Sequence, residues 1–261
     1  MKTNPMITPE SRVGNRILAR GEARQLYASR LASRPEEVRA AQGLRFLVFN
    51  IELKEGLEQS FATCLDADPF DEVCEHLLVE YLPTREIVGT YRLQTGQTAA
   101  AQRGYYSSQE FDFTPYEPLR GELIELGRAC VHSEHRNLAV LGLLWKGIAA
   151  YARERNARYL IGCSSLTSQD PQAGASMFAE LSRRHLAPAE LRTQPRSEFA
   201  CPLDRRAAQT PKVPKLLSAY LSIGARICGP PAIDREFKTI DFLTLLDLKS
   251  LPPRTVERYL S

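Results

Sequence analysis

The stretch that decides the fold runs from residue 122 to residue 165 and reads ELIELGRACV (122–131), HSEHRN (132–137), LAVLGLLWKGIAAYARERNA (138–157) and RYLIGCSS (158–165). Apolar residues fill Leu123–Val131 and Tyr159–Ser165, which predicts two buried strands. Between them, a helix is predicted over Leu138–Asn156. Its apolar residues recur at helical spacing: Leu141, Leu144, Trp145, Ile148 and Tyr151.

The junction between the first strand and the helix is a candidate site. The first N–H groups of a helix have no partner within the helix, and together with the helix dipole they favour an anion or a polarised carbonyl. Val131 ends the strand, while Arg136 and Asn137 add a cation and a capping residue. Every α/β protein has such junctions, so an ordinary junction is the alternative.

Further elements lie on both sides of this stretch. The sequence predicts helices over Pro35–Glu58, Asp170–Leu186, Lys215–Ile227 and Pro252–Leu260, a hairpin of Val73–Tyr81 with Ile87–Leu93, and a strand over Phe242–Leu248. Ile17–Tyr27 fits a strand or a helix, and Gly96–Gly104 reads as a loop. Tyr105–Tyr116, aromatic and acidic, is expected to cover a site or line its entrance. This order predicts an α/β fold, a mixed sheet with helices on both faces.

Length and composition limit the possible roles. The 261 residues suit a flexible N-terminus (1–15), a single domain (16–250) and a C-terminal tail (251–261). Five prolines make 188–214 an excursion, which continues with the amphipathic helix to residue 235. The net charge of +3 is too small to indicate nucleic acid. Without a long apolar run or a signal peptide, a cytoplasmic protein is expected.

The six cysteines do not form a C-x-x-C pair, so neither a zinc ribbon nor a thioredoxin motif is expected, and no metal site is predicted. Their surroundings are mostly apolar, which favours buried, reduced thiols. Cys74 lies two residues before His76, so both would share one face of a strand. This is the pair to test as nucleophile and base.

Several blocks of the sequence occur in the order of a known pattern. They are LRFLVF (44–49) with Glu52, DPFDEVCEHLLV (68–79), VGTYRL (88–93), ELGRACVH (125–132), RN (136–137), LWKGI (144–148), YLIGC (159–163), GARICG (224–229), PAID (231–234) and DFL (241–243). Together they resemble the ornithine N-acyltransferases of bacterial aminolipid synthesis. The resemblance covers Arg39–Leu248 in order. It implies the GNAT acyltransferase fold, with a central, partly splayed mixed sheet.

The same skeleton resembles the acyl-homoserine-lactone synthases more distantly. Their pattern implies substrate-binding or site roles for Arg45, Phe49, Asp68, Asp71, Arg92, Glu125 and Arg128. The tryptophan that those synthases carry beyond the phenylalanine is missing here, where the sequence reads ELKE (52–55). That absence weakens the lactone-synthase alternative.

Both resemblances imply an acyl-carrier-protein thioester as the donor and an amine as the acceptor. The expected reaction moves a fatty or 3-hydroxyfatty acyl group to the α-amine of an amino acid, ornithine above all, with glycine, lysine and glutamine as alternatives. A lactone-type synthase, a small-molecule acetyltransferase and a degenerate domain that only binds carrier protein or lipid are the rivals. No permanently bound cofactor is expected.

One loop departs from the GNAT pattern. A glycine-rich loop usually cradles the coenzyme A pyrophosphate, but the equivalent Arg136–Leu141 reads RNLAVL, with Leu138 where glycine is common. Backbone cannot approach a phosphate as closely without glycine. This argues against tight binding of coenzyme A and suits a carrier protein, whose pantetheine arm carries one phosphate.

Attack on a thioester needs a neutral amine and a polarised carbonyl, and an aliphatic amine has a pKa of about 10. Glu125 is the candidate base because its apolar neighbours would raise its pKa; the alternative is an ion pair with Arg128 or Arg92. Strand periodicity places Glu125 and Arg128 on opposite faces unless a bulge at or near Gly127 intervenes. The backbone N–H freed there would stabilise the oxyanion.

The other charged residues have two interpretations each. Asp68 and Asp71 would bind the ammonium groups of a cationic acceptor, or cap a loop. His76 would relay a proton, or be structural. Arg45 and Arg92 would hold the acceptor carboxylate, or pair with the aspartates.

Basic residues cluster at Arg153, Arg155 and Arg158, at Arg183 and Arg184, and at Arg205, Arg206, Lys212 and Lys215. An acidic carrier protein and the inner membrane surface are both possible partners, and a solvated face is the alternative. The helix Lys215–Ile227 would lie on the bilayer or pack against the core.

Overall fold

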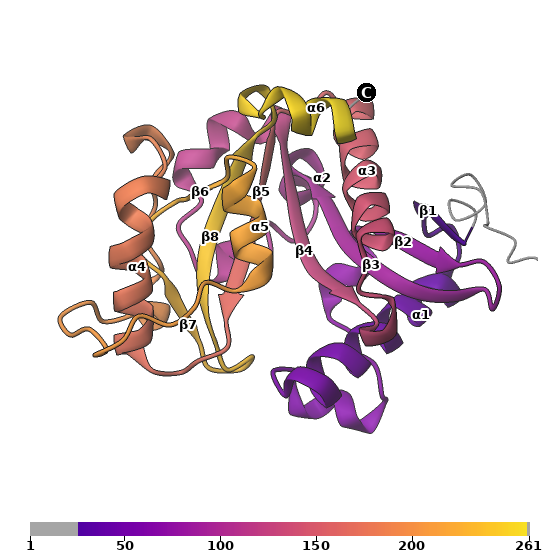
Figure 1. Cartoon of the computed structure of the whole chain (residues 1–261), viewed down its shortest axis with the longest axis horizontal. Helices are drawn as coiled ribbons and strands as arrows, with labels where there is room; N and C mark the ends of the chain where they lie inside the picture. Colours follow the sequence, from indigo (N-terminus) through magenta and orange to yellow (C-terminus); the bar gives the residue numbers. More distant parts are fainter. Residues whose placement is uncertain (1–25, 260–261) are drawn as a thin grey trace, which may run out of the picture.

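A single mixed sheet runs through the computed structural model, which describes residues 26–259. The strands lie in the order β1-β2-β3-β4-β5-β8-β6, with β7 paired to β8 (Figure 1). Their bounds are β1 Tyr27–Leu31, β2 Glu75–Tyr81, β3 Glu86–Thr95, β4 Leu123–Val131, β5 Tyr159–Leu166, β6 Arg226–Ile227, β7 Ala232–Asp234 and β8 Thr239–Asp247. The α/β prediction is confirmed.

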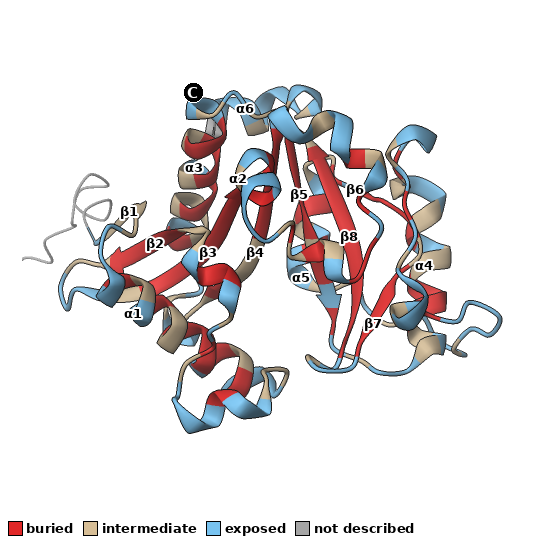
Figure 2. Ribbon diagram, turned by 180° about the vertical axis from the view of Figure 1, so that it is seen from behind, coloured by how far each residue is buried: buried red, intermediate tan, exposed pale blue. Residues whose placement is uncertain are grey.

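Helices cover both faces of the sheet (Figures 1 and 2). The α-helices are α1 Pro35–Phe46, α2 Gly96–Ala101, α3 Leu138–Glu154, α4 Pro171–His185, α5 Lys215–Ser222 and α6 Pro253–Tyr259. The apolar side of α3 packs on Leu77, Val79 and Leu126. The opposite face of β4 carries Leu123, which packs among the aromatic residues of 105–116.

The predicted strand–helix–strand unit is confirmed as β4, α3 and β5. Of the neighbouring strand pairs in the sheet, β4 and β5 form the parallel one, and they pair only over Leu123–Glu125 and Tyr159–Ile161. Beyond that point the two strands separate, although a Cβ on Gly162 would still lie 2.1 Å from the Leu126 carbonyl oxygen. The predicted splaying is therefore present, and Gly162 sits where the fork opens.

The predicted bulge is also present. In the β3–β4 ladder Thr90 faces Cys130 and Arg92 faces Gly127, so β4 holds one residue more than β3 between these pairs. Arg128 follows Gly127 and has a φ of 50°, in the left-handed region that a side chain disfavours. The extra residue of a bulge shifts the alternation of side chains, so the residues that follow it point to the face opposite to the one expected. Arg128 therefore lies on the same side as Glu125.

Two helix predictions were wrong at their ends. The helix that begins at Pro35 changes to a π-helix over Leu47–Leu53 and ends at Lys54, whose φ is 59°, so it does not reach Glu58. The helix that begins at Lys215 ends at Ser222, because Gly224 has a φ of 105° and Arg226–Ile227 join the sheet as β6. In both places a left-handed residue ends the helix where the apolar pattern continues.

The loop prediction for Gly96–Gly104 was wrong in its first half. Thr95 caps the short helix α2 by accepting a hydrogen bond from the Thr98 amide at 3.1 Å. The other predicted elements differ from the structure by a few residues at most, and the hairpin of β2 and β3 is confirmed. Asp170 caps α4 as expected, and 188–214 holds only short 3₁₀ turns.

The predictions for 1–15 and for most of Ile17–Tyr27 fall outside the described residues. Among residues 26–259, no helix is long and apolar enough to cross a membrane.

Candidate active site

A cavity of about 240 Å³ opens where β4 and β5 separate, and it is called the fork cavity here. Gly127, Arg128 and Ala129 of the bulge line one wall, and Cys163, Ser164 and Ser165 of β5 line the other. Phe49 and Leu53 of the π-helix, Leu216, Leu217 and Tyr220 of α5, and Phe237 add apolar surface. Tyr106, Ser107 and Glu110 also reach the cavity, so the expectation for Tyr105–Tyr116 is confirmed.

Glu125 lines the fork cavity and is buried. Its carboxylate accepts hydrogen bonds from the Tyr106 amide at 2.8 Å and from the Ser107 amide at 2.7 Å. Burial raises the pKa of Glu125, and the hydrogen bonds from Ser107 and Tyr106 offset only part of that rise. A carboxylate with a raised pKa beside a cavity has the properties of a general base.

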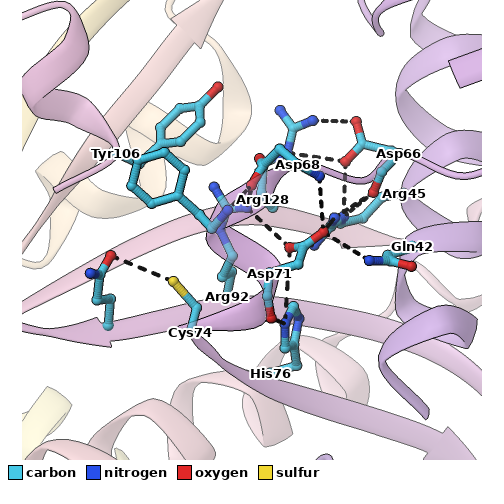
Figure 3. Close-up of polar contacts among 12 residues, drawn as sticks. Gln42, Arg45, Asp66, Asp68, Asp71, Cys74, His76, Arg92, Tyr106 and Arg128 are labelled. Atoms are coloured by element: carbon cyan, nitrogen blue, oxygen red, sulfur yellow. Dashed lines mark hydrogen bonds and ion pairs between the residues drawn. The ribbon is translucent and has the colours of Figure 1, made fainter. Parts of the chain in front are cut away.

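A network of arginines and aspartates fills the space between α1 and the sheet (Figure 3). Arg45, 0% exposed, donates to Asp66 through Nε at 2.9 Å and to both carboxylate oxygens of Asp71 at 2.9 and 2.5 Å. Burial alone would raise the pKa of Asp71, but the bonds and charge of Arg45 hold it well below its usual value. Arg45 and Asp71 lie behind the cavity wall and are not part of its lining.

Arg92 connects this network to the cavity. Its Nη1 donates to Asp68 at 2.7 Å and to Asp71 at 3.0 Å, and its guanidinium lies 4.9 Å from the ring centre of Tyr106. Its Nη2 is buried without a hydrogen-bond partner, although Arg92 lines the cavity. An unpaired buried donor is costly, so Nη2 is suited to an acceptor oxygen of a ligand. Asp68 also caps the turn at 69–72, which agrees with the alternative prediction that it caps a loop.

Arg128 places its guanidinium over the rings of Phe49 and Phe237, at 5.1 and 4.5 Å from their centres. It also donates to both carboxylate oxygens of Asp66. Two aromatic rings and one carboxylate therefore hold the guanidinium of Arg128, which fixes the side chain that follows the bulge.

His76 and Cys74 are not a nucleophile and base pair in this structure. The His76 ring lies behind Asp71, with Nε2 3.2 Å from the Asp71 carbonyl oxygen, and burial lowers its pKa. The Cys74 thiol donates to Gln94 at 3.5 Å, and burial raises its pKa to about 12. A thiol with that pKa stays protonated and is a poor nucleophile. All six cysteines are free thiols, as expected, but Cys64 is exposed and is not one of the buried thiols that were predicted.

The start of α3 lies apart from the fork cavity. Arg136 donates to Glu52 and, through Nε at 3.1 Å, to the Val131 carbonyl oxygen. Asn137 caps the helix and accepts from the amides of Ala139 and Val140 at 3.0 and 3.1 Å. These amides are the groups that would otherwise receive a phosphate.

Several cavity or network residues do not figure among the sequence candidates. Asp66 bridges Arg45 and Arg128 from a loop, and Glu110 and Asp241 bring two carboxyl groups to the cavity from segments 131 positions apart. The acidic character of Tyr105–Tyr116 was the signal for Glu110. Only the pairing of β8 beside β5 brings Asp241 to the same place.

The chain matches known acyltransferases along most of its length. Residues 44–146 match the family described as "Acetyltransferase (GNAT) domain". The L-ornithine N(alpha)-acyltransferase of Rhodobacter capsulatus is 35% identical over 245 residues, which are 89% of this chain and 94% of that protein. The enzyme of the same name from Brucella abortus is 36% identical over 247 residues, 88% of this chain and 87% of that protein.

Solved structures share the fold at low sequence identity. The N-acyl amino acid synthase FeeM superposes with a TM-score of 0.50 at 14% identity, covering 90% of this chain and 94% of that one. The acyl-homoserine-lactone synthase LasI gives a TM-score of 0.50 at 11% identity, covering 89% and 94%. With the bulge, the forked strands and the two full-length relatives, these matches show that the chain is an acyltransferase of the GNAT fold and belongs to the L-ornithine N(alpha)-acyltransferase family.

Proposed function

We propose that this acyltransferase moves a fatty or 3-hydroxyfatty acyl group from an acyl-carrier-protein thioester to the α-amine of an amino acid, ornithine above all. The observation that carries the proposal is that one cavity joins a buried base, Glu125, a bulged backbone at Gly127–Ala129 and an unpaired arginine nitrogen on Arg92. Base, oxyanion donor and carboxylate anchor are the three groups that aminolysis by an amino acid requires.

In this mechanism the thioester carbonyl lies at the bulge. The extra residue of a bulge is left out of the ladder, so a backbone N–H there is available to the carbonyl oxygen. Glu125, directly or through a water, takes a proton from the α-ammonium group, and the neutral amine that results attacks the carbonyl carbon. The raised pKa of Glu125 brings it closer to that of the amine and makes the transfer easier. The C–S bond of the tetrahedral intermediate then breaks to form the amide, and the extra proton on the nitrogen passes to the departing thiolate, which leaves as the carrier thiol.

Arg92 is the anchor proposed for the α-carboxylate of the acceptor. Its Nη1 is already held by Asp68 and Asp71, which fixes the guanidinium, while Nη2 remains without a partner. A fixed guanidinium loses little freedom when it binds a carboxylate. Asp68 and Asp71 thus support the anchor rather than bind an ammonium group themselves.

A carrier protein is the proposed donor for two reasons. First, the amides at the start of α3 are already bonded to Asn137, and Leu138 is 73% exposed where a glycine would admit a pyrophosphate.

Secondly, a groove lined by Arg183, Arg184 and Arg206, called the basic groove here, lies across α5 from the fork cavity. Leu216, Leu217 and Tyr220 of α5 line the cavity, whereas Ser218 and Ser222 line the groove.

Three arginines outside the groove are less suited to a partner because each has an acidic neighbour. Arg155 pairs with Glu75, Arg158 with Asp247, and Arg205 lies 3.8 Å from Asp204. A double charge reversal, Arg183→Glu with Arg184→Glu, should raise the KM for acyl-carrier protein about tenfold or more and leave the KM for ornithine unchanged. An unchanged KM for the carrier protein would exclude the basic groove as its docking surface.

Contact with the inner face of a membrane is proposed at the edge of the fork cavity. Leu47, Ile51 and Leu53 of the π-helix are 41%, 49% and 41% exposed, and the nearby Phe61 is 53% exposed. Phe49 and Leu53 of the same helix line the cavity, so a lipid product would leave beside this apolar surface. Ile51→Ser with Phe61→Ser should reduce sedimentation with anionic vesicles; equal sedimentation would refute this contact.

Expression in a bacterial host that lacks N-acyl amino acids tests the proposed function. Lipid extracts should contain new N-acyl amino acids, with acyl ornithine dominant, and the Glu125→Ala variant should abolish them while the protein remains folded. If a soluble, folded wild-type protein gives no such lipid in a host with loaded carrier protein, the proposed function is wrong.

A further inference from the structure

We infer that Glu110 and Asp241 form a subsite for the side-chain ammonium group of a diamino acid, and that this subsite selects the acceptor. The inference rests on the proposed acylation of an amino acid. It adds the residues that bind the side chain of the acceptor.

Two buried carboxyl groups meet at one end of the fork cavity. Glu110 and Asp241 are 4% and 5% exposed, and both line the cavity. The Glu110 Oε2 atom has no hydrogen-bond donor in ideal geometry among the described residues, and Asp241 Oδ1 lacks one too, although the hydroxyls of Ser165 and Thr239 lie close to the Asp241 carboxyl group. One carboxylate oxygen from each residue and the Cys163 Sγ lie within 4.8 Å of one another. Two unsatisfied acceptors this close are costly without a donor between them.

The charge of the cavity is unbalanced in the direction that a cation would correct. Five acidic side chains line it: Glu55, Glu110, Glu125, Asp234 and Asp241. Its two arginines, Arg92 and Arg128, are already engaged with Asp66, Asp68 and Asp71, which lie outside the lining. A cavity lined by excess negative charge attracts a cationic ligand. An α-carboxylate on Arg92 and a side-chain ammonium on the acidic pair would orient a diamino acid.

Without a bound cation, the crowded pair shares a proton, which removes part of this negative charge until an ammonium group takes its place. Burial raises the pKa of Asp241 to about 6, and burial with the charges of Asp241 and Asp234 raises that of Glu110 well above its usual value. The groups that act on Glu110 come from β8 (Asp241), β7 (Asp234) and β4 (Glu125), and all are acidic. An ammonium group bound between the two carboxylates would replace the shared proton.

A metal ion fits this cluster less well than an ammonium group. The third atom of the cluster is the Cys163 thiol, and burial raises the pKa of Cys163 well above its usual value. A cysteine must lose its proton to bind a metal, so this thiol is a poor ligand. An ammonium group instead donates hydrogen bonds to both carboxylates.

The wild-type enzyme offers the first test, with ornithine compared against norvaline, which has the same carbon chain without the side-chain amine. Ornithine should have a kcat/KM at least about 100-fold above norvaline. The KM for ornithine should rise as the pH falls through about 6, because a protonated pair cannot bind a cation. The KM for norvaline should lack that rise.

Variants of Glu110 and Asp241 distinguish binding of the acceptor's ammonium group from a purely structural role of these residues. Asp241→Asn and Glu110→Gln should each lower kcat/KM for ornithine about 100-fold and change that for norvaline by less than threefold. A structural role would lower both values together. Glu198→Gln, on an exposed residue outside the cavity, is the control and should change neither value.

The outcomes distinguish the two hypotheses. Equal kcat/KM for ornithine and norvaline in the wild type overturns the subsite and leaves acylation intact. Acylation of neither substrate removes the proposed function. Loss of ornithine selectivity after chelation, with recovery on adding Mg²⁺, Mn²⁺ or Zn²⁺, would assign the pair to a metal and also overturn the inference.

Discussion

Arg45 and Asp71 form a two-point ion pair in the interior of the protein, with Nη1 and Nη2 bonded to the two carboxylate oxygens at 2.9 and 2.5 Å. Asp71 is therefore neutralised before any acceptor arrives. The pair holds Arg92 by a third contact at 3.0 Å, so its effect on the cavity is indirect. The acceptor's cationic group then needs carboxylates elsewhere, and Glu110 and Asp241 supply them.

Replacing Asp71 should be costly because it leaves Arg45 buried and only partly paired. We expect Asp71→Ala to lower the free energy of unfolding by about 3–5 kcal/mol, measured by urea denaturation. Glu72→Ala is the matched control, because the Glu72–Arg103 pair is exposed and such pairs contribute less than about 1 kcal/mol. Equal losses in the two variants would contradict the role of the buried network.

The lowered pKa of Asp71 predicts how the free energy of unfolding depends on pH. The pKa of Asp71 is lower in the folded chain than its unfolded value of about 4, so its contribution is present above that value and is lost as the pH falls. The difference in unfolding free energy between the wild type and Asp71→Asn should therefore be largest above pH 5 or so and narrow toward pH 2 or so. A difference independent of pH would contradict the lowered pKa.

Glu125→Gln should lower kcat/KM by about 10²–10⁴-fold, the usual contribution of a general base. Because burial raises the pKa of Glu125, the wild-type kcat at saturating ornithine should fall as the pH drops through that raised value, and this acidic limb of kcat should disappear in the variant. Glu122→Gln, an exposed neighbour, is the control and should retain both activity and the limb.

A purely structural role of Glu125 makes a different prediction. The carboxylate holds the amides of Tyr106 and Ser107, so a structural role would lower the melting temperature and leave the shape of the pH profile unchanged. Thermal unfolding of the same variant, measured beside the kinetics, distinguishes the two roles.

The fork between β4 and β5 depends on Gly162. A Cβ at this position would lie 2.1 Å from the Leu126 carbonyl oxygen, which is backbone and cannot rotate away. Gly162→Ala should therefore destabilise the protein by more than about 2 kcal/mol, within the range of strongly destabilising substitutions. Gly142→Ala is the control: it has open space within α3 and should stabilise by about 0.5–1 kcal/mol. Similar effects on urea denaturation would contradict the close approach.

Arg92→Lys tests the carboxylate anchor. A lysine keeps a positive charge for Asp68 and Asp71 but cannot present a second, fixed donor to the cavity. The KM for the amino acid should rise at least about tenfold, whereas the KM for acyl-carrier protein should stay within about twofold. A matching rise in both constants would show a general loss of structure instead.

The fold was largely predictable because its signals are local. The apolar runs of β4 and β5 and the spacing in α3 predict these elements, and the conflict between Glu125 and Arg128 predicts the bulge that Arg128 forms. The ends of the helices were less predictable. Lys54 is left-handed in spite of its side chain, and nothing in its neighbours indicates that the helix stops there.

The site was predictable only in part, because its pairings depend on tertiary structure. The sequence allowed Arg45 and Arg92 to bind a substrate or to pair with aspartates. Only the packing of α1 on the sheet shows that Arg45 pairs with aspartates, whereas Arg92 pairs through Nη1 and keeps Nη2 without a partner. Asp66 and Asp241 carry no local signal. They become site residues because a loop and β8 bring them beside Arg128 and Glu110.

The most direct test is the product of the purified protein with 3-hydroxyacyl-carrier protein and ornithine, analysed by tandem mass spectrometry. We expect one amide, with the acyl group on the α-nitrogen, and no reaction with Nα-acetylornithine. Acylation of Nα-acetylornithine, or no amide with a carrier protein that serves another acyltransferase in the same assay, would contradict the proposed reaction.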